Sequence, residues 1–354
     1  MRLVIAVTAA ALALAACSSS GTSGSSTSAA APSTSAAPAP TSASPSSSPS
    51  SSAAPQENRA VVIVSGGGAT SPFTTPTEAC SDEDGFLAAG NTDTALREYL
   101  LAQGKQVYTA PAYLDWGQVQ EPDPTSFGPF KDCPPALPEL MTIMSSGDLD
   151  AGGARLARFI DYLHDEYGVT DVDFVGHSNG GLYARAAIKV LKGTDSPVTV
   201  RSLTMMGSPI EGGVPTRYYA GEIPLEACKG DAFCESFNTM WLKYADEGDK
   251  GLNGEDTVKF LMGPDGWNAA QAGVLDDIPV TLIAGTFFDA KSGDKSVWPY
   301  DGITSRYSAW ATTVPDAVIP HRACWSAPLT HSIFVSDFAK EDWSTAMTWN
   351  TEAL

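Results

Sequence analysis

One stretch decides the fold of this chain: Val172-Asp173-Phe174-Val175-Gly176-His177-Ser178-Asn179-Gly180-Gly181. The apolar run 172–175 predicts a buried strand, and the apolar periodicity of 182–191 predicts a helix. Between them stands Gly-x-Ser-x-Gly, whose glycines leave room for a strand and a helix to cross closely. The turn would expose the Ser178 hydroxyl at the positive end of a helix. This context indicates a nucleophilic serine; the alternative is a glycine-rich turn with a capping serine.

Strand and helix patterns alternate on both sides of this stretch. Because alternating strands and helices are joined by right-handed crossovers, they predict an α/β fold with a mostly parallel central sheet flanked by helices. The further strand patterns are 60–64, 106–110, 200–206, 280–284 and, more weakly, 316–319, and the further helix patterns are 92–103 and 154–167.

One interval, between Gly207 and Ile278, breaks the alternation. It has no good strand pattern, and it carries large apolar residues at helical spacing: Phe233, Phe237, Met240, Trp241 and Tyr244. This predicts a helical cap insertion at about 211–277, over the carboxyl edge of the sheet. The stripe either attaches the insertion to the domain or lines an acyl-binding cleft.

Two motifs resemble a known fold family. The segment 176–185, GHSNGGLYAR, and the turn Gly207-Ser208-Pro209 are similar to those of the lipase and esterase branch of the α/β-hydrolase fold. The resemblance covers most of 60–337. It is close around Ser178 and weak in the insertion. It implies a serine esterase whose catalytic residues follow in the order Ser, acid, His.

The resemblance and the histidine count point to a base. The chain has four histidines. His164 falls in a predicted helix before the serine. His177 adjoins the serine, at a position where the family often has a histidine that does not act as the base. His321 and His331 both follow the last strand pattern. The setting of His331, in a loop that runs into the final helix, resembles that of the family's catalytic histidine, so we expect His331 to be the base.

The acid is expected on the loop after the strand pattern at 280–284, where the candidates are Asp289, Asp294 and Asp301. Asp301-Gly302-Ile303 resembles the Asp-Gly-hydrophobic turn of bacterial lipases, so Asp301 is favoured. Asp289 is the next candidate because it is nearest the strand end. Each of these residues could instead be a solvated loop carboxylate.

The glycine-rich turn Ser65-Gly66-Gly67-Gly68 predicts backbone donors for an oxyanion. By resemblance, Gly67 and Asn179 supply the two amides, and Gly66 or Gly68 would be one-residue errors. Phosphate binding is the competing interpretation. It is disfavoured because no Lys-Ser/Thr pair follows and the Gly-x-Gly-x-x-Gly spacing is absent.

These parts predict a serine hydrolase that cleaves carboxylic esters, apolar or lipid esters, through an acyl-enzyme on Ser178. The sequence contains no His-Glu-x-x-His pattern and no evident calcium loop, so no metal and no cofactor are expected. Two alternatives remain: an acyltransferase with the same triad, and a non-catalytic surface binding module on a hydrolase-like scaffold. The intact set of Ser178, Asp301 and His331 argues against the binding module.

The amino terminus predicts export and anchoring. Arg2 followed by an apolar run and small residues is typical of a secretion signal. Leu14-Ala15-Ala16-Cys17 resembles a bacterial lipoprotein signal, so residues 1–17 are expected to end in a lipidated Cys17. The chain would then be a cell-envelope lipoprotein held on the outer face of a membrane. The alternative is an ordinary signal peptide in which Cys17 is incidental.

Composition separates a linker from a domain. Residues 18–55 are only Ser, Ala, Pro, Thr and Gly, which predicts a disordered linker over 18–57 before a hydrolase domain at 58–354. The whole chain carries 21 Lys and Arg against 41 Asp and Glu, a net charge of −20. It therefore lacks the basic surface of nucleic-acid-binding proteins.

The cysteines fit an exported protein, in which disulfides are expected. Cys228 and Cys234 could close a small loop, and Cys80 and Cys133 could join the segment after the first strand. This arrangement would leave Cys324 without a partner, and the sequence does not fix the pairing.

Overall fold

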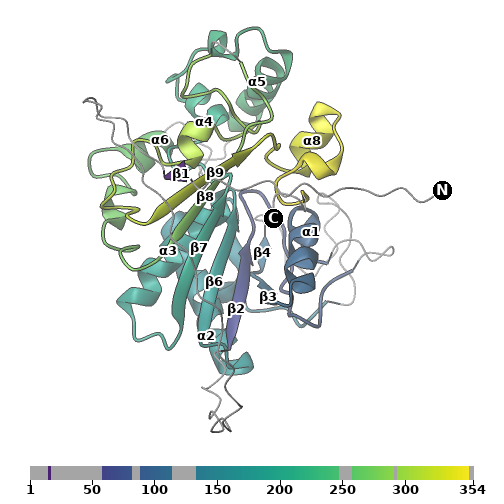
Figure 1. Ribbon diagram of the computed structural model, residues 1–354, viewed down its shortest axis with the longest axis vertical. Helices are drawn as coiled ribbons and strands as arrows, with labels where there is room; N and C mark the ends of the chain where they lie inside the picture. The colour runs from purple at the N-terminus through teal and green to yellow at the C-terminus, as the bar shows by residue number, and fades with distance from the viewer. Residues whose placement is uncertain are drawn as a thin grey trace, which may run out of the picture.

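The central element of the fold is a sheet with the strand order β1-β9-β8-β7-β6-β2-β3 (Figure 1). The computed structural model describes residues 15–16, 58–81, 88–113, 133–246, 257–290 and 293–350. Every neighbouring pair from β9 to β3 is parallel, and only β1 runs antiparallel, beside β9. The predicted α/β class with a mostly parallel sheet is therefore confirmed. The strands of this sheet are β1 (Ala15–Ala16), β2 (Arg59–Val64), β3 (Gln106–Thr109), β6 (Asp171–His177), β7 (Thr199–Met206), β8 (Val280–Gly285) and β9 (Arg322–Ala327).

Helices cover both faces of the sheet. A second, two-stranded parallel sheet is made by β4 (Ala112–Tyr113) and β5 (Ile143–Met144). The α-helices are α1 (Gly90–Ala102), α2 (Leu149–Tyr167), α3 (Asn179–Gly193), α4 (Val214–Tyr219), α5 (Ala232–Asp246), α6 (Thr257–Met262), α7 (Arg306–Ala309) and α8 (Ile333–Ala339). Short 3-10 helices occur at η1 (Glu139–Met141), η2 (Leu225–Cys228), η3 (Ala269–Gln271) and η4 (Trp343–Thr345).

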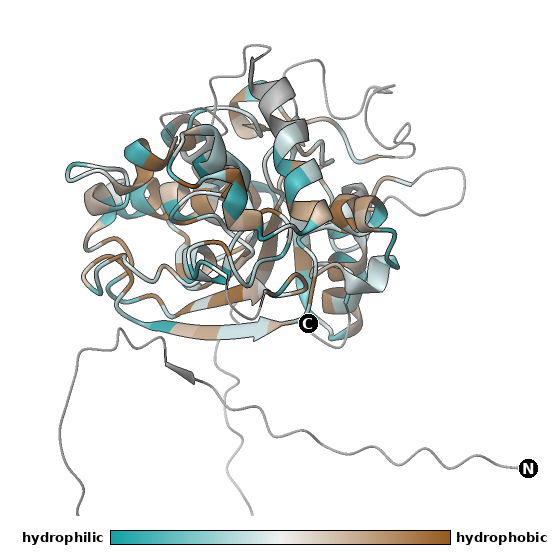
Figure 2. Cartoon of the chain, turned by 90° about the horizontal axis from the view of Figure 1, so that it is seen from above, coloured by the Kyte–Doolittle hydropathy of each residue, from teal (hydrophilic) through white to brown (hydrophobic). Residues whose placement is uncertain are grey.

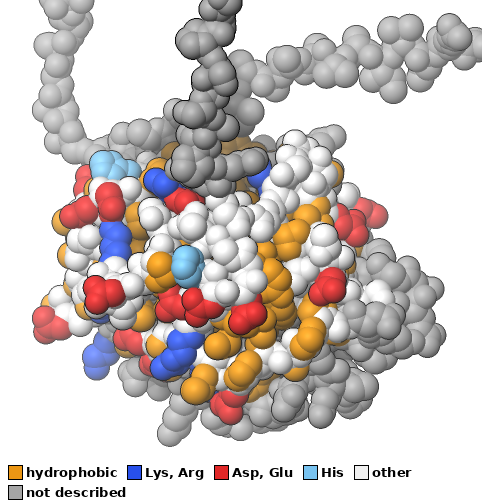
Figure 3. Space-filling view, turned by 90° about the horizontal axis from the view of Figure 1, so that it is seen from below, with side chains coloured by type: hydrophobic (Ala, Val, Ile, Leu, Met, Phe, Trp, Pro, Cys, Tyr) orange, Lys and Arg blue, Asp and Glu red, His pale blue; other side chains and the backbone are white. Residues whose placement is uncertain are grey.

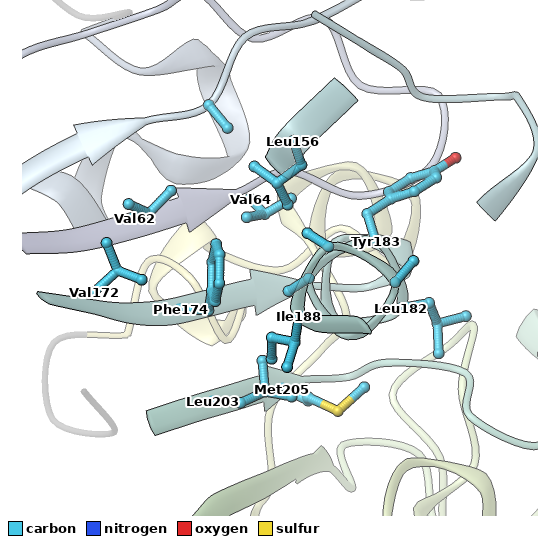
Figure 4. Close-up of a cluster of buried hydrophobic side chains, with 14 of the residues drawn as sticks. Val62, Val64, Leu156, Val172, Phe174, Leu182, Tyr183, Ile188, Leu203 and Met205 are labelled. Atoms are coloured by element: carbon cyan, nitrogen blue, oxygen red, sulfur yellow. The ribbon is translucent and has the colours of Figure 1, made fainter. Parts of the chain in front are cut away.

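Alternate residues of each strand build two hydrophobic cores. Val62 and Val64 point to the core that contains α2 and α3, shown around α3 in Figure 4. Val61 and Ile63 point to the opposite face, where Leu96 of α1 packs. This is the period-2 alternation that a strand covered on both faces requires. Figure 2 shows hydrophobic segments along the strands and hydrophilic segments mostly on outer loops and helices.

One predicted strand is wrong. Residues 316–319 form a turn, in which the Val318 amide donates to the Pro315 carbonyl, and the strand lies later, at β9. Val318 and Ile319 are buried in the core that contains α2 and α3, although they belong to no strand. The strand β9 was concealed because most of its side chains are only partly buried, which gives it no apolar pattern.

The insertion after β7 is helical, as predicted, and contains α4, η2, α5 and α6. It shares a small core with the segment that precedes Asp301, because Val214 and Cys228 pack with Val297 and Trp298. The Trp298 indole also donates to the Ala227 carbonyl at 2.7 Å. The insertion and this loop therefore pack as one unit. Of the predicted aromatic stripe, the side chains beyond residue 239 of α5 lie outside the described residues.

Disulfides join Cys80 to Cys133 and Cys228 to Cys234, the two pairs that the sequence suggested. Cys324, which the sequence left without a partner, is also disulfide-bonded, so that expectation is wrong. The predicted linker and Cys17 fall outside the described part of the chain. In the described part, no helix combines the length and the apolar character needed to cross a membrane. Acidic side chains are scattered over the lower face of the molecule, among basic and hydrophobic ones (Figure 3).

Candidate active site

Ser178 occupies a strained turn between β6 and α3. Its backbone has φ 54° and ψ −130°, a conformation that costs a non-glycine residue about 1–3 kcal/mol. The Ser178 amide donates to the Met206 carbonyl at 2.8 Å, which fixes the turn against the end of β7. The side chain is partly exposed and stands at the N-terminus of a 15-residue helix. This is the conformation that presents a serine hydroxyl as a nucleophile.

Two glycines make this turn possible. A Cβ atom on Gly176 would lie 2.4 Å from the Gly181 nitrogen, and one on Gly180 would lie 2.0 Å from the Val64 oxygen. Both contacts are with backbone atoms, which cannot move aside without displacing the strand or the helix. The two glycines of the Gly-x-Ser-x-Gly pattern are therefore required by the close crossing of β2, β6 and α3.

Asp301 and His331 form a buried pair. The His331 Nδ1 lies 2.8 Å from Asp301 Oδ2, and the side chains belong to residues that are 5% and 0% exposed. Asp301 Oδ1 accepts hydrogen bonds from the amides of Ile303 and Thr304, at 2.9 and 2.7 Å. Because a carboxylate only accepts, Nδ1 of the imidazole is the donor, and in the neutral imidazole the lone pair is then on Nε2.

The other sequence candidates lie apart from this pair. Asp289 and Asp294 are exposed, and the Asp294 carboxylate accepts from the Ser296 amide, which lowers its pKa. His321 is exposed at the start of β9. His164 lies in the last turn of α2 and contacts the Val169 carbonyl. None of these four makes a hydrogen bond to Asp301 or His331 among the described residues.

Ser178 lies at the same edge of the sheet as the buried pair. Met206, whose carbonyl binds the Ser178 amide, is followed by Gly207, and a Cβ there would lie 3.0 Å from Asp301 Oδ2. His177, the residue before the serine, contacts the His331 carbonyl through its Nε2 at 2.7 Å. The described residues contain no hydrogen bond between the Ser178 hydroxyl and the His331 imidazole. Such bonds are often long without substrate and shorten when it binds.

The glycine turn after β2 lies against the serine. A Cβ on Gly66 would be 2.6 Å from the Ser178 Cβ and 3.2 Å from its Oγ, whereas one on Gly67 would be 2.5 Å from the Asn179 side-chain nitrogen. The Gly68 amide is directed to the Ser145 carbonyl, at 3.4 Å. The backbone of Gly66 and Gly67 thus borders Ser178 and Asn179, and Gly68 faces away.

A buried carboxyl group supports this turn, and sequence analysis missed it. Asp93, in the first turn of α1, is 1% exposed and accepts a hydrogen bond from the Ser65 hydroxyl. Its other oxygen has no partner among the described residues. Burial is the main cause that raises the pKa of Asp93 to about 6, although the Ser65 hydrogen bond acts in the opposite direction. Acidic residues are common in the first turn of helices, so the sequence alone does not distinguish Asp93 from other acidic residues.

Five phenylalanines form an aromatic cluster between α5 and α8. Phe233 stacks on Phe288 with ring centroids 4.1 Å apart, and Phe338 lies edge-on to Phe233 and Phe237 at 5.5 and 5.4 Å. Phe334 and Phe338 remain 44% and 39% exposed, which is unusual for large apolar side chains. Both helices stand above the sheet in Figure 1.

The aromatic cluster adjoins the acid loop. A Cβ on Gly302, the neighbour of Asp301, would lie 3.2 Å from the Phe288 ring and 3.5 Å from the Phe233 ring. The helix α8 that carries Phe334 and Phe338 begins two residues after His331. The cluster is therefore next to the Asp301–His331 pair. The sequence suggested only its α5 members, because Phe288, Phe334 and Phe338 follow no single helical stripe.

Comparisons with known proteins find only distant similarities. No family model matches the chain, and no curated protein matches it. Solved structures that resemble it include a lipase of Bacillus licheniformis, at 14% identity over 78% of this chain and 87% of that chain, with a TM-score of 0.38. A lipase-esterase related protein of Clostridium acetobutylicum has 14% identity over 80% and 92%, with a TM-score of 0.38. An esterase of Pyrococcus furiosus has 14% identity over 80% and 78%, with a TM-score of 0.37.

These similarities are too low to transfer an activity. The fold follows from the chain itself: the parallel order β3-β2-β6-β7-β8-β9, with a strained serine after β6, an aspartate after β8 and a histidine after β9. That arrangement is the α/β-hydrolase fold. Metal-binding clusters of three or more His, Cys, Asp or Glu side chains are absent from the described residues.

Substitution of Gly66 tests the placement of the glycine turn. In Gly66→Ala the new methyl group would press on the Ser178 side chain, so we expect labelling of Ser178 by a fluorophosphonate to slow by about 100-fold. Gly193→Ala is the matched control, because a Cβ there meets nothing within 4 Å. Wild-type labelling of the Gly66 variant would show that the turn lies elsewhere.

Substitution of Asp93 tests its raised pKa. Because the pKa is about 6 in the folded chain and 3.8 otherwise, this group's contribution to stability is present at low pH and is lost as pH rises through 6. In Asp93→Asn the free energy of unfolding should rise at pH 8 by up to about 3 kcal/mol, with little change at pH 4. Urea unfolding at both pH values measures this. Asp289→Asn, at an exposed position, should change neither value, and equal effects of Asp93→Asn at both pH values would contradict the raised pKa.

Proposed function

We propose that this chain is a serine hydrolase that cleaves carboxylic esters through an acyl-enzyme on Ser178. The observation that carries the proposal is the buried Asp301–His331 pair at the sheet edge where Ser178 stands in a strained turn. A structural role alone does not explain why an unfavourable serine backbone is held beside a buried imidazole–carboxylate pair. Strained residues that the surroundings enforce cluster at active sites.

The first half of the reaction follows from the protonation of His331. Its Nε2 takes the proton from the Ser178 hydroxyl as Oγ attacks the ester carbonyl carbon. Asp301 keeps the other proton on Nδ1 and stabilises the imidazolium that forms. When the tetrahedral intermediate collapses, the bond to the alcohol oxygen breaks, and Nε2 returns the proton to the leaving alcohol. Ser178 then carries the acyl group as an ester.

The second half repeats these steps with water. His331 Nε2 takes a proton from water, and the hydroxide oxygen attacks the acyl carbon. The second intermediate releases the carboxylic acid, and Ser178 Oγ regains its proton. In both halves the oxyanion is stabilised by backbone amides, to which we assign Asn179 and the glycine turn, with Gly67 as the first donor. Gly66, whose backbone borders the Ser178 side chain, is the alternative donor.

An apolar acyl group is the substrate that the surroundings of the site favour. The exposed rings of Phe334 and Phe338 belong to the aromatic cluster that adjoins the Asp301 loop, and burial of their apolar area would stabilise a bound acyl chain. The net charge of −20 disfavours the approach of anionic substrates.

The proposal is tested with p-nitrophenyl esters from acetate to palmitate. Ser178→Ala and His331→Ala should each lower kcat by at least about 10³-fold, because triad members act as a unit. The matched controls are His321→Ala and Asp289→Asn, which should keep wild-type rates. Phe338→Ser should shift the preference towards shorter acyl chains. Activity that survives in Ser178→Ala would overturn the serine mechanism, and ester transfer to an added alcohol in place of acid release would identify an acyltransferase.

We further propose that the chain is exported and that lipidation of Cys17 anchors it to a membrane, which requires that Cys17 is not the partner of the disulfide-bonded Cys324. The signal-like segment 1–17 and the uncharged stretch 18–55 of the predicted linker support this. Two or more acyl chains on Cys17 would give stable anchoring. In the expressed full chain, Cys17→Ser should move the protein from the membrane fraction to the soluble fraction. Peptide mapping that finds Cys17 in a disulfide would contradict lipidation, since the same sulfur cannot carry both groups.

A further inference from the structure

His177, directly before the nucleophile, links the two halves of the candidate site. It ends β6, is 3% exposed, and its Nε2 lies 2.7 Å from the backbone carbonyl oxygen of His331. The two residues are 154 positions apart in the chain. Their imidazole rings lie 4.9 Å apart at 46°. The proposed mechanism assigns His177 no role.

The contact defines the protonation of His177. A carbonyl oxygen only accepts, so the His177 Nε2 carries a proton and donates a hydrogen bond to the His331 carbonyl. The Nδ1 atom is buried and has no partner among the described residues. A second proton on that atom would be a buried charge without a partner, which is why burial, helped by the neighbouring His331, lowers the pKa of His177 to about 3. His177 is therefore neutral at the pH values at which serine hydrolases work.

This bond completes the attachment of His331. The His331 amide donates to the Asp301 carbonyl at 2.8 Å, and its Nδ1 donates to the Asp301 carboxylate. Both of these attachments come from the acid loop. The bond from His177 is the only hydrogen bond within the described residues that ties the main chain of His331 to β6, the strand that leads into Ser178. Without it, the described main chain of His331 would keep its bond to the acid loop but lose its direct bond to the residue before Ser178.

We propose that His177 is a positioning residue that sets the place of the His331 imidazole relative to the Ser178 hydroxyl. The inference rests on the proposed function, since it takes Ser178 and His331 to be nucleophile and base. A displacement of 1 Å between reacting groups can lower a rate by about 100-fold, so a bond that fixes this distance contributes to turnover without touching substrate. The neutral state of His177 also means that no second positive charge stands beside the imidazolium of His331 during turnover.

The donor and the volume of His177 can be separated by two substitutions. In His177→Gln an amide N–H reaches close to the place of the imidazole Nε2, whereas in His177→Leu a side chain of similar bulk has no donor. We expect kcat of His177→Leu to fall by about 10- to 100-fold while KM stays within about twofold of wild type. His177→Gln should restore most of the loss. Ser178→Ala, measured alongside, reports separately on the proposed function, because activity that remains there would overturn the serine mechanism and not the positioning.

A second readout needs no ester substrate. The proton between His331 Nδ1 and Asp301 should give a distinct downfield NMR signal in the wild type and in His177→Gln. In folded His177→Leu, as judged by circular dichroism, the signal should broaden or exchange faster because the His331 main chain has lost an attachment. An unchanged signal together with wild-type kcat in His177→Leu would overturn the proposal. Equal losses in the Leu and Gln variants would overturn it as well, since they would show that ring shape and not the donor matters.

Discussion

The backbone of Ser178 is the constraint on which the rest of the structure depends. A serine at φ 54° and ψ −130° does not persist unless neighbouring elements hold it there. The end of β7 holds its amide, and Gly176 and Gly180 let β6, α3 and β2 approach until no Cβ would fit between them. Packing of α3 on α2 and of β6 between β2 and β7 then makes the strain part of the core.

The cap insertion packs on the loop that ends in Asp301, the residue that contacts His331. Because Trp298 and Val297 pack inside the small core of the insertion, the loop that ends in Asp301 gains its rigidity from α4 and the Cys228–Cys234 disulfide. The Val214 amide also donates to the Ile303 carbonyl, two residues after Asp301. The part of the insertion that packs on this loop therefore supports the Asp301 carboxylate.

The sequence predicted those features that depend on local pattern. The strand–turn–helix around Ser178 was predictable because apolar periodicity and two glycines act over ten residues, and the parallel sheet followed from alternation. The strand β9 was not, because a strand with mostly partly buried side chains lacks an apolar run, and Val318 and Ile319 gave a false one. Asp301 and His331 came from resemblance to a family, and their contact joins loops that the sequence alone cannot place together. The bond from His177 to His331 and the burial of Asp93 depend on tertiary packing, which leaves no mark in the pattern.

Among the buried polar atoms without partners in the described residues are Asp93 Oδ1, behind the glycine turn, and His177 Nδ1, next to Ser178. Each unpaired buried polar group costs about 1–3 kcal/mol, so an apolar residue at either place would raise stability if stability were all that mattered. Each of these side chains uses its second atom for a bond that fixes a segment of the site, Asp93 to Ser65 and His177 to His331. An apolar replacement would lose that bond. The unfavourable burial is therefore the consequence of a directional contact that is made where water is excluded.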